Sequence, residues 1–422
     1  YWSLVANLAK AGAEEEVFTA RYYGSRGEKR ELRTADEVET LIRELKTREY
    51  VVSSVKKKER RRVQPLPFTT STMQQEAGRK LGFTVRRTMR AAQQLYEGLP
   101  LGSAGTAGLV TYIRTDSTRV GDSARGEALS YIESRYGAEY KGFTRKDGGE
   151  KRFVQGAHEC IRPTSVFREP EAVKEFLTQD QYKLYRLIWE RFLASQMAPA
   201  VYDTVVVDIQ AGEHLLRANG STLRFPGFTR VYVEGRDDED KDGEESLPDL
   251  SEGEVLRLQG MKGKQHFTQP PPRYTEAMLV KALEEKGIGR PSTYAPTIET
   301  IQDREYVTKE KGRFRPTDLG RTVIDLLREH FPNIVDVEFT AAMEHDLDGV
   351  ESGDRGWLDV VQEFYGPFSS MLEAADSRIK RVERADEPTD IVCEQCGRMM
   401  VVKRGRFGKF LACPGFPECR NT

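Results

Sequence analysis

The C-terminal end of the chain constrains folding most, because four cysteines are crowded into it. Cys393 and Cys396 are separated by two residues, and Cys413 and Cys419 by five. Strand-like segments lie between the two pairs, which is how a zinc ribbon brings four thiolates to tetrahedral distance around one metal ion. The whole chain has 5 cysteines, too few for a disulfide scaffold. We therefore expect structural Zn²⁺ bound by these four residues.

Cations and aromatic residues alternate between the two cysteine pairs. The residues concerned are Lys403, Arg404, Arg406, Phe407, Lys409 and Phe410. A single nucleic-acid strand is bound by such a mixture, because its phosphates attract cations and its bases stack on rings. The alternative is that the aromatic rings pack the interior of a very small ribbon. The sequence leaves both interpretations open.

Length and composition indicate a protein of several domains. The chain has 422 residues, of which 38% are hydrophobic and 31% charged, and no apolar run approaches the roughly 20 residues that span a bilayer. We expect a soluble, cytoplasmic protein without membrane contact. The chain begins at Tyr1 without a signal-peptide pattern, so we expect that a preceding part is missing, through truncation or a split gene.

The formal net charge of -2 conceals strong local patterning. A basic run covers residues 56–62, and an acidic tract lies near residues 235–246. A charge run is most often a solvated face, and only its surroundings can make it a surface that contacts DNA. We interpret the acidic tract as a surface loop without metal, because magnesium carboxylates need a rigid support.

Strand patterns occur on both sides of a mainly helical stretch. Short apolar alternations at 17–23 and 50–55 flank a helical segment at 35–45, and further strand patterns follow at 203–209, 215–218 and 230–233. A sheet interrupted by a helical insertion explains this order. We expect sheet in 1–71 and 199–270, a helical domain in 72–198, a second helical domain in 271–385 and the zinc ribbon in 390–422.

Capping residues locate several helices in these domains. Ser71 with Gln74 forms a capping-box pattern that predicts a helix through Leu81, and Thr84 caps the next helix. Farther along, Thr275 and Ser292 cap two helices that precede a hairpin over residues 306–315. Helix, turn, helix and hairpin together are typical of a winged helix.

The segment Thr111–Thr118, with the sequence TYIRTDST, contains the candidate for covalent chemistry. A lone tyrosine is usually structural, because a phenol with a pKa near ~10 needs help to ionise. Arg114 follows Tyr112 by two residues along the strand expected over 109–113, so both side chains project to one face. A guanidinium there can hold a phosphate under attack and stabilise its developing charge.

This segment resembles the active-site motif of type IA DNA topoisomerases, and its Asp-Ser-Thr ending is closest to the bacterial topoisomerase I branch. Three more blocks resemble that family in order and spacing: residues 67–75 the start of its tyrosine domain, 157–163 its histidine motif and 287–307 its DNA-binding motif. The cysteine-rich end is similar to its zinc modules. The resemblance covers essentially the whole chain.

The resemblance implies an α+β multidomain fold, in which a torus is built from a β-rich arch, a helical tyrosine domain and a winged-helix-like DNA-binding part, followed by the zinc ribbon. It implies that Tyr112 is the nucleophile forming a 5′-phosphotyrosine, that Arg114 places the scissile phosphate and that His158 is an auxiliary group. DNA contacts are implied for Arg114 and for a further set: Arg162, Arg290, Ser292, Thr293 and Arg304. Arg162 could equally be a structural ion-pair partner.

The family relaxes negatively supercoiled DNA by cutting one strand, passing the other and resealing the cut, without ATP. Its Toprim domain supplies a catalytic glutamate, a lysine and an acidic triad for Mg²⁺, and it precedes the region that this sequence resembles. We therefore expect this chain alone to be incomplete for catalysis. The implied partners are single-stranded and negatively supercoiled DNA, the Toprim domain and RNA polymerase. The resemblance also implies a monomer that is associated with the nucleoid.

Two other interpretations remain open at this stage. A zinc-containing single-strand binder or transcription-regulatory module explains the cations, aromatics and cysteines, but it gives no use to Tyr112 and His158. A relative of topoisomerase III or reverse gyrase shares the chemistry, and the Thr-Asp-Ser-Thr ending together with the ribbon argues against it.

Overall fold

The computed structural model describes residues 1–143, 158–235, 246–379, 387–405 and 408–422. It forms two compact units, Tyr1–Gly356 and Trp357–Thr422. None of the described helices is both long and apolar enough to cross a membrane. The acidic tract at 236–245, together with Arg406 and Phe407 of the ribbon, lies outside the described residues.

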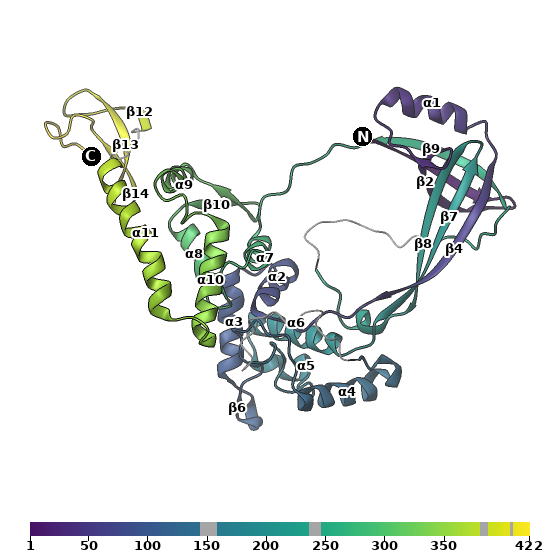
Figure 1. The fold of residues 1–422 in the computed structure, drawn as a ribbon, viewed down its shortest axis with the longest axis horizontal. Helices are drawn as coiled ribbons and strands as arrows, with labels where there is room; N and C mark the ends of the chain where they lie inside the picture. The colour runs from purple at the N-terminus through teal and green to yellow at the C-terminus, as the bar shows by residue number, and fades with distance from the viewer. Residues whose placement is uncertain (144–157, 236–245, 380–386, 406–407) are drawn as a thin grey trace. The chain divides into compact units, whose positions relative to one another are not determined.

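Six antiparallel strands of the first unit close into a barrel (Figure 1). The strands are β1 (Trp2–Lys10), β2 (Ala13–Ser25), β4 (Tyr50–Arg62), β7 (Ala200–Ala211), β8 (His214–Phe225) and β9 (Val255–Gln265). Their order is β1-β9-β4-β7-β8-β2, and β1 also pairs with β2, so the sheet has no free edge apart from the short β3 (Glu28–Lys29) beside β2. Closure protects backbone groups that would otherwise pair with another chain.

The barrel interior follows from alternation along its strands. In β1, Leu4, Ala6 and Leu8 are buried while the intervening residues are partly exposed. Helix α1 (Ala35–Leu45) adds Val38, Leu41 and Leu45 to the same core. The predicted helix at 35–45 is therefore present with the expected bounds, and its first turn is closed by a Thr34–Glu37 capping box.

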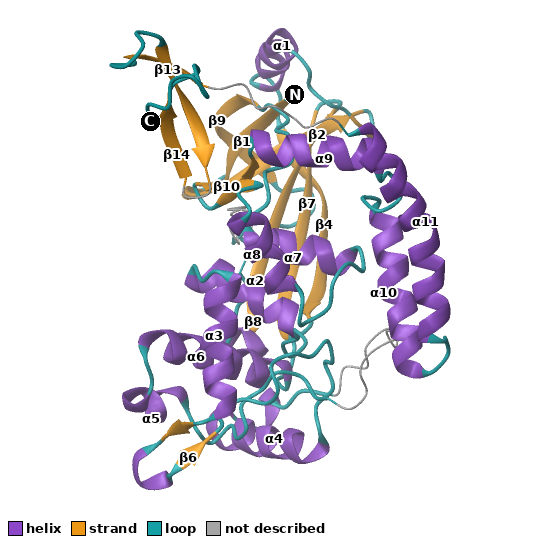
Figure 2. Ribbon diagram, turned by 90° about the vertical axis from the view of Figure 1, so that its left-hand side faces the viewer, coloured by secondary structure: helices purple, strands orange, loops and turns teal. Residues whose placement is uncertain are grey.

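A helical insertion separates two strands that are neighbours in the barrel. The chain leaves β4 at Arg62, returns in β7 at Ala200, and pairs these residues with each other. The helices between them are α2 (Thr70–Leu81), α3 (Val85–Glu97), α4 (Asp122–Tyr136), α5 (Pro170–Val173) and α6 (Gln179–Ser195) (Figure 2). Short 3-10 turns occur at Gly102–Ala104, Ala138–Tyr140 and Lys174–Phe176, and β5 (Leu99–Pro100) pairs with β6 (Thr106–Ala107).

Three local predictions were wrong by a shift or a change of type. Helix α2 begins at Thr70 with Thr69 as its cap, because the Thr69 hydroxyl accepts from the backbone N–H of Thr72 and Thr72 reciprocates. The expected strand at 230–233 is absent, since a 3-10 turn occupies Gly227–Arg230 and Tyr232 is buried among the helices instead. Its hydroxyl donates to the buried carboxylate of Glu76.

The third correction concerns the part predicted to bind DNA. It contains α7 (Glu276–Glu285), α8 (Tyr294–Asp303), β10 (Val307–Glu310), β11 (Arg313–Pro316), α9 (Asp318–His330) and α10 (Val337–Ser352). Thr275 caps α7, and β10 with β11 forms the predicted hairpin. Ser292 does not cap α8. Thr293 occupies that position, and its hydroxyl accepts from the backbone N–H of Arg290 at 2.8 Å instead of from the helix.

The second unit consists of α11 (Trp357–Arg378) and a three-stranded sheet. The strands are β12 (Glu387–Val392), β13 (Met399–Gly405) and β14 (Gly408–Ala412), in the order β12-β13-β14. The register places Lys403 directly opposite Phe410. Residues that stand opposite each other across two strands share a face of the sheet, so a cation and a ring lie side by side.

Candidate functional site

Tyr112 lies in an irregular segment, so the strand predicted over 109–113 was wrong. Val110 forms one isolated bridge with Pro163, and the Thr111 N–H donates to the carbonyl of Arg162 at 3.0 Å. The Thr111 hydroxyl donates to the carbonyl of Cys160 at 2.7 Å. The backbone is thus satisfied by several partners in turn, where a strand would have one continuous neighbour.

The segment is fixed on its other side by Thr70, the first residue of α2. The Thr70 N–H donates to the carbonyl of Thr115 at 2.9 Å, and its hydroxyl accepts from the N–H of Thr115 at 2.9 Å. The same hydroxyl lies 2.7 Å from the carbonyl of Ile113, to which it donates. Thr70 is fully buried, so these bonds hold Tyr112 and Arg114 without competition from water.

Two aromatic rings hold the ring of Tyr112. Tyr96 meets it edge-on with centroids 5.5 Å apart, and His158 lies at 4.8 Å with planes inclined by 37°. Tyr96 belongs to the last turn of α3, and the carbonyl of Leu95 in that turn accepts from the N–H of Leu109 at 2.7 Å. The structure thus places His158 against the ring of Tyr112, and its role as an auxiliary group near the scissile phosphate stays a prediction.

Tyr112 and Arg114 line one cavity of about 620 Å³. The full lining is Arg86, Met89, Arg90, Gln93, Glu97, Tyr112, Ile113, Arg114 and Glu299. Arg114 is exposed and Tyr112 is half-buried, so both are accessible to a ligand. The sequence predicted that Tyr112 and Arg114 lie on one face of a strand. In the structure, the hydrogen bonds of Thr70 and Thr111 bring both residues to the same cavity instead.

The cavity is rich in arginine. Arg86 approaches Glu299 at 3.8 Å, whereas within the described part of the chain neither Arg90 nor Arg114 pairs with a carboxylate. The amide of Gln93 donates to Glu97 at 2.6 Å. Two guanidinium groups without an internal anion favour an anionic ligand, and phosphate matches their geometry. Arg114 was predicted from the sequence, whereas Arg90 was missed, because only the packing of α3 brings it to this cavity.

The side chain of Arg162 forms hydrogen bonds within the protein. Its Nε donates to Glu159 Oε2 at 2.7 Å and its Nη1 to the carbonyl of Pro163 at 3.0 Å. Its own carbonyl accepts from Thr111, so the residue supports the Tyr112 segment through the backbone. The ion pair with Glu159 is the structural alternative stated for Arg162, and contact with DNA stays a prediction.

The other predicted DNA contacts do not line the cavity beside Tyr112. Arg290 forms a two-point contact with Asp348, with Nη2 2.6 Å and Nε 3.1 Å from the carboxylate oxygens, and lies 3.6 Å from Glu344. Ser292, Thr293 and Arg304 are exposed. The DNA-binding role of all four stays a prediction, and Arg290 would have to exchange its carboxylate partner for a phosphate.

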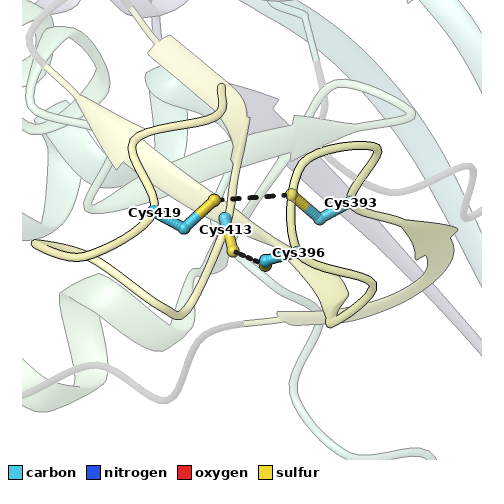
Figure 3. A group of neighbouring side chains, drawn as sticks. All are labelled: Cys393, Cys396, Cys413 and Cys419. Carbon is cyan, nitrogen blue, oxygen red and sulfur yellow. Dashed lines mark hydrogen bonds between the residues drawn. The ribbon is translucent and has the colours of Figure 1, made fainter.

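The four ribbon cysteines converge as predicted (Figure 3). The Sγ atoms of Cys393 and Cys419 are 3.6 Å apart, those of Cys396 and Cys413 are 3.3 Å apart, and all four lie within 4.8 Å of one another. A tetrahedral zinc with Zn–S bonds of about 2.3 Å requires sulfurs about 3.8 Å apart, so this donor set fits Zn²⁺.

A residue outside the ligand set tunes the first thiol of the cluster. The amide of Asn421 donates to Cys393 Sγ at 3.3 Å and, as the largest cause, lowers the pKa of that thiol to about 6. A thiolate is the form that binds metal, so this bond favours ligation.

Fold and site together define a type IA DNA topoisomerase. Residues 1–362 match the DNA topoisomerase family, and residues 390–422 match the topoisomerase DNA-binding C4 zinc finger. The chain therefore belongs to the type IA DNA topoisomerases, and its mixed α/β fold with a cysteine ribbon is theirs. The resemblance drawn from the sequence is confirmed.

Within that family the chain is similar to a bacterial topoisomerase I. Full-length topoisomerase I from Thermotoga maritima is 37% identical and superposes with a TM-score of 0.73, over 100% of this chain and 66% of that one. The chain thus spans 66% of the length of the protein that it matches.

Proposed function

We propose that this chain supplies the nucleophile and the strand-binding surface for relaxation of negatively supercoiled DNA. The observation that carries the proposal is that Tyr112 and Arg114 line one cavity while His158 lies against the tyrosine ring. One DNA strand is cut, the other passes through the break, and the cut is resealed. The zinc ribbon adds affinity for single-stranded DNA.

The covalent step exchanges one phosphoester bond for another, so the number of phosphoester bonds does not change. Oη of Tyr112 loses its proton to solvent and attacks the scissile phosphorus, the bond from phosphorus to the 3′-oxygen breaks, and the downstream fragment stays on the protein as a 5′-phosphotyrosine. Arg114 stabilises the negative charge that builds up on the phosphoryl oxygens. His158, which lies against the ring of Tyr112, is an auxiliary group. Resealing is the reverse attack by the 3′-hydroxyl, so no ATP is needed.

The leaving 3′-oxygen needs a proton, and relaxation in this family uses Mg²⁺. Of the cavity residues only Glu97 and Glu299 are carboxylates, and the four ribbon cysteines are the only cluster among the described residues with enough donors for a metal. The described residues therefore do not fit Mg²⁺ beside Tyr112. We propose that a Toprim domain provides both the acid and the magnesium site.

A substrate with an activated leaving group tests the nucleophile separately from the acid. In a single-stranded oligonucleotide labelled at its 3′ end, one bridging 3′-oxygen is replaced by sulfur, because a thiolate leaves without protonation. We expect a labelled protein adduct on a denaturing gel with this oligonucleotide, and none with Tyr112→Phe. The all-oxygen oligonucleotide should react far more slowly.

Each result decides one part of the proposal. An adduct that persists in Tyr112→Phe would refute the assignment of the nucleophile. Equal rates on sulfur and oxygen substrates would refute the need for an external acid. Salt-sensitive binding without any adduct on the sulfur substrate would support the alternative of a non-catalytic DNA-binding module.

A further inference from the structure

The face of α3 that lines the cavity carries more polar groups than the covalent step uses. Arg86, Arg90, Gln93 and Glu97 follow one another at intervals of four, three and four residues, so they form one stripe along the helix. The opposite side of α3 packs into the protein interior through Val85, Thr88, Ala91, Ala92 and Leu95. The orientation of the stripe toward the cavity is therefore fixed by core packing.

Helix α3 is also coupled directly to the nucleophile. Tyr96 holds the ring of Tyr112 edge-on at 5.5 Å, and Leu95 accepts from Leu109 at 2.7 Å, three residues before the tyrosine. The helix that carries the stripe is therefore joined to the Tyr112 segment by a ring contact and a backbone hydrogen bond.

The cavity has one more unpaired guanidinium than the scissile phosphate needs. Arg114 is assigned to that phosphate, and Arg86 is partly compensated by Glu299 at 3.8 Å. Arg90 is exposed, lines the cavity and has no carboxylate partner among the described residues. A volume of about 620 Å³ exceeds a single phosphate and is within the range of small-molecule pockets, so a second nucleotide unit fits.

We propose that Arg90 is a positioning residue that binds the phosphate immediately downstream of the scissile one. This inference rests on the proposed function, because it concerns the fragment that Tyr112 retains. After cleavage the upstream strand ends in a free 3′-hydroxyl, whereas the downstream strand is bonded to Tyr112. A cation on the helix joined to the Tyr112 segment holds the retained fragment and keeps its phosphotyrosine aligned for resealing.

Neutral phosphate analogues test the position of this contact. The sulfur-containing oligonucleotide is prepared with a methylphosphonate at the next linkage downstream, or at the next linkage upstream as a control. With the full chain, the downstream methylphosphonate should slow adduct formation roughly tenfold. Arg90→Gln should slow the all-phosphate substrate by a similar factor, and the downstream methylphosphonate should then have less than about a twofold further effect, since both changes remove one contact.

Salt dependence gives a second measurement that needs no chemistry. In the Tyr112→Phe background, log affinity for single-stranded DNA falls linearly with log salt concentration, by about 0.7 for each phosphate contacted. Arg90→Gln should reduce that slope by about one contact, and Arg90→Lys should restore it. Arg135→Gln is the matched control, because Arg135 is an exposed cation on α4 outside the cavity, and it should leave the slope unchanged.

The two measurements separate this inference from the proposed function. Absence of any adduct would contradict the covalent role of Tyr112, while the salt slope would still decide whether Arg90 binds phosphate. An unchanged slope in Arg90→Gln would overturn the contact itself. Coupling to the upstream methylphosphonate in place of the downstream one would overturn the assignment to the retained fragment.

Discussion

The Tyr112 cavity and the zinc ribbon differ in how their functional side chains are held in position. Around Tyr112, a large helical core and buried hydrogen bonds to Thr70 place a few reactive groups. In the ribbon, the buried cluster is Cys393, Met400, Cys413 and Cys419, so three of its four members are metal ligands. The packed core therefore positions the residues around Tyr112, whereas in the ribbon the metal ligands themselves stabilise the fold. Disturbing each should therefore have different consequences.

Loss of zinc should have the largest effect, and only on the ribbon. Structural zinc sites bind with apparent free energies of roughly 10–16 kcal/mol, and most of that is folding energy. We expect Cys413→Ser to lower the zinc content from one per chain to near zero and to unfold residues 390–422. Metal analysis and amide hydrogen exchange measure both.

Cys160→Ser is the matched control for that experiment. Cys160 is fully buried in the helical core, and burial raises the pKa of its thiol to about 12, so it stays protonated and is no ligand. Zinc content should remain one per chain. Zinc retained in Cys413→Ser but lost in Cys160→Ser would refute the ligand assignment.

Tyr112→Phe should show the converse behaviour, with all covalent chemistry lost and the fold intact. The substitution deletes one hydroxyl, and within the described residues that hydroxyl forms no hydrogen bond, so the free energy of unfolding should change by less than about 0.5 kcal/mol. Affinity for single-stranded DNA should stay within about a few fold. Adduct formation, urea unfolding and fluorescence anisotropy check the three statements. A large loss of affinity would show that Tyr112 has a binding role.

The two regions also differ in how well their sequences predicted them. Cysteine spacing identifies all four ligands, because a tetrahedral metal imposes the geometry wherever the chain runs. Arg90 and Tyr96 could not be assigned to the Tyr112 site, because only the packing of α3 brings them there. The strand pattern at 109–113 failed because periodicity does not show which partners satisfy the backbone.

The barrel could be predicted from the sequence less completely than the zinc ligands but better than the Tyr112 site. Strand patterns at 203–209 and 215–218 are present in β7 and β8, and the prediction of a sheet interrupted by helices agrees with the pairing of β4 and β7. The pairing of β1 with β9, which closes the barrel, was not predictable, because no local pattern encodes a pairing between strands so far apart in sequence.

Thr70→Val should destabilise the Tyr112 site by an intermediate amount. The change leaves the N–H of Thr115 and the carbonyl of Ile113 buried without the hydroxyl that bonds them, which costs about 2–3 kcal/mol. The rate of adduct formation should fall as well, because these bonds place Tyr112. Urea unfolding and adduct kinetics measure the two effects.

Thr88→Val provides the comparison for Thr70→Val. Thr88 is also fully buried, but its hydroxyl donates to the carbonyl of Thr84, the N-cap of the same helix, so the loss should be below about 1 kcal/mol and adduct formation should persist. Equal losses in the two variants would mean that the contacts of Thr70 with the Tyr112 segment contribute nothing special.

Phe410→Ala should have the smallest effect and decides what the aromatic residues of the ribbon do. Phe410 is 42% exposed and stands opposite Lys403, so its ring is accessible to a base beside a cation. Stacking contributes about 1–3 kcal/mol per base, and a partly covered ring should lie at the low end, giving roughly fivefold to tenfold weaker binding of single-stranded DNA. Zinc content should not change.

Leu411→Ala is the matched control, because Leu411 packs against the cysteine cluster and its loss should destabilise the ribbon itself. If Phe410→Ala lowered ribbon stability as much as Leu411→Ala, the ring would be part of the packing, and the ribbon would bind DNA through its cations alone.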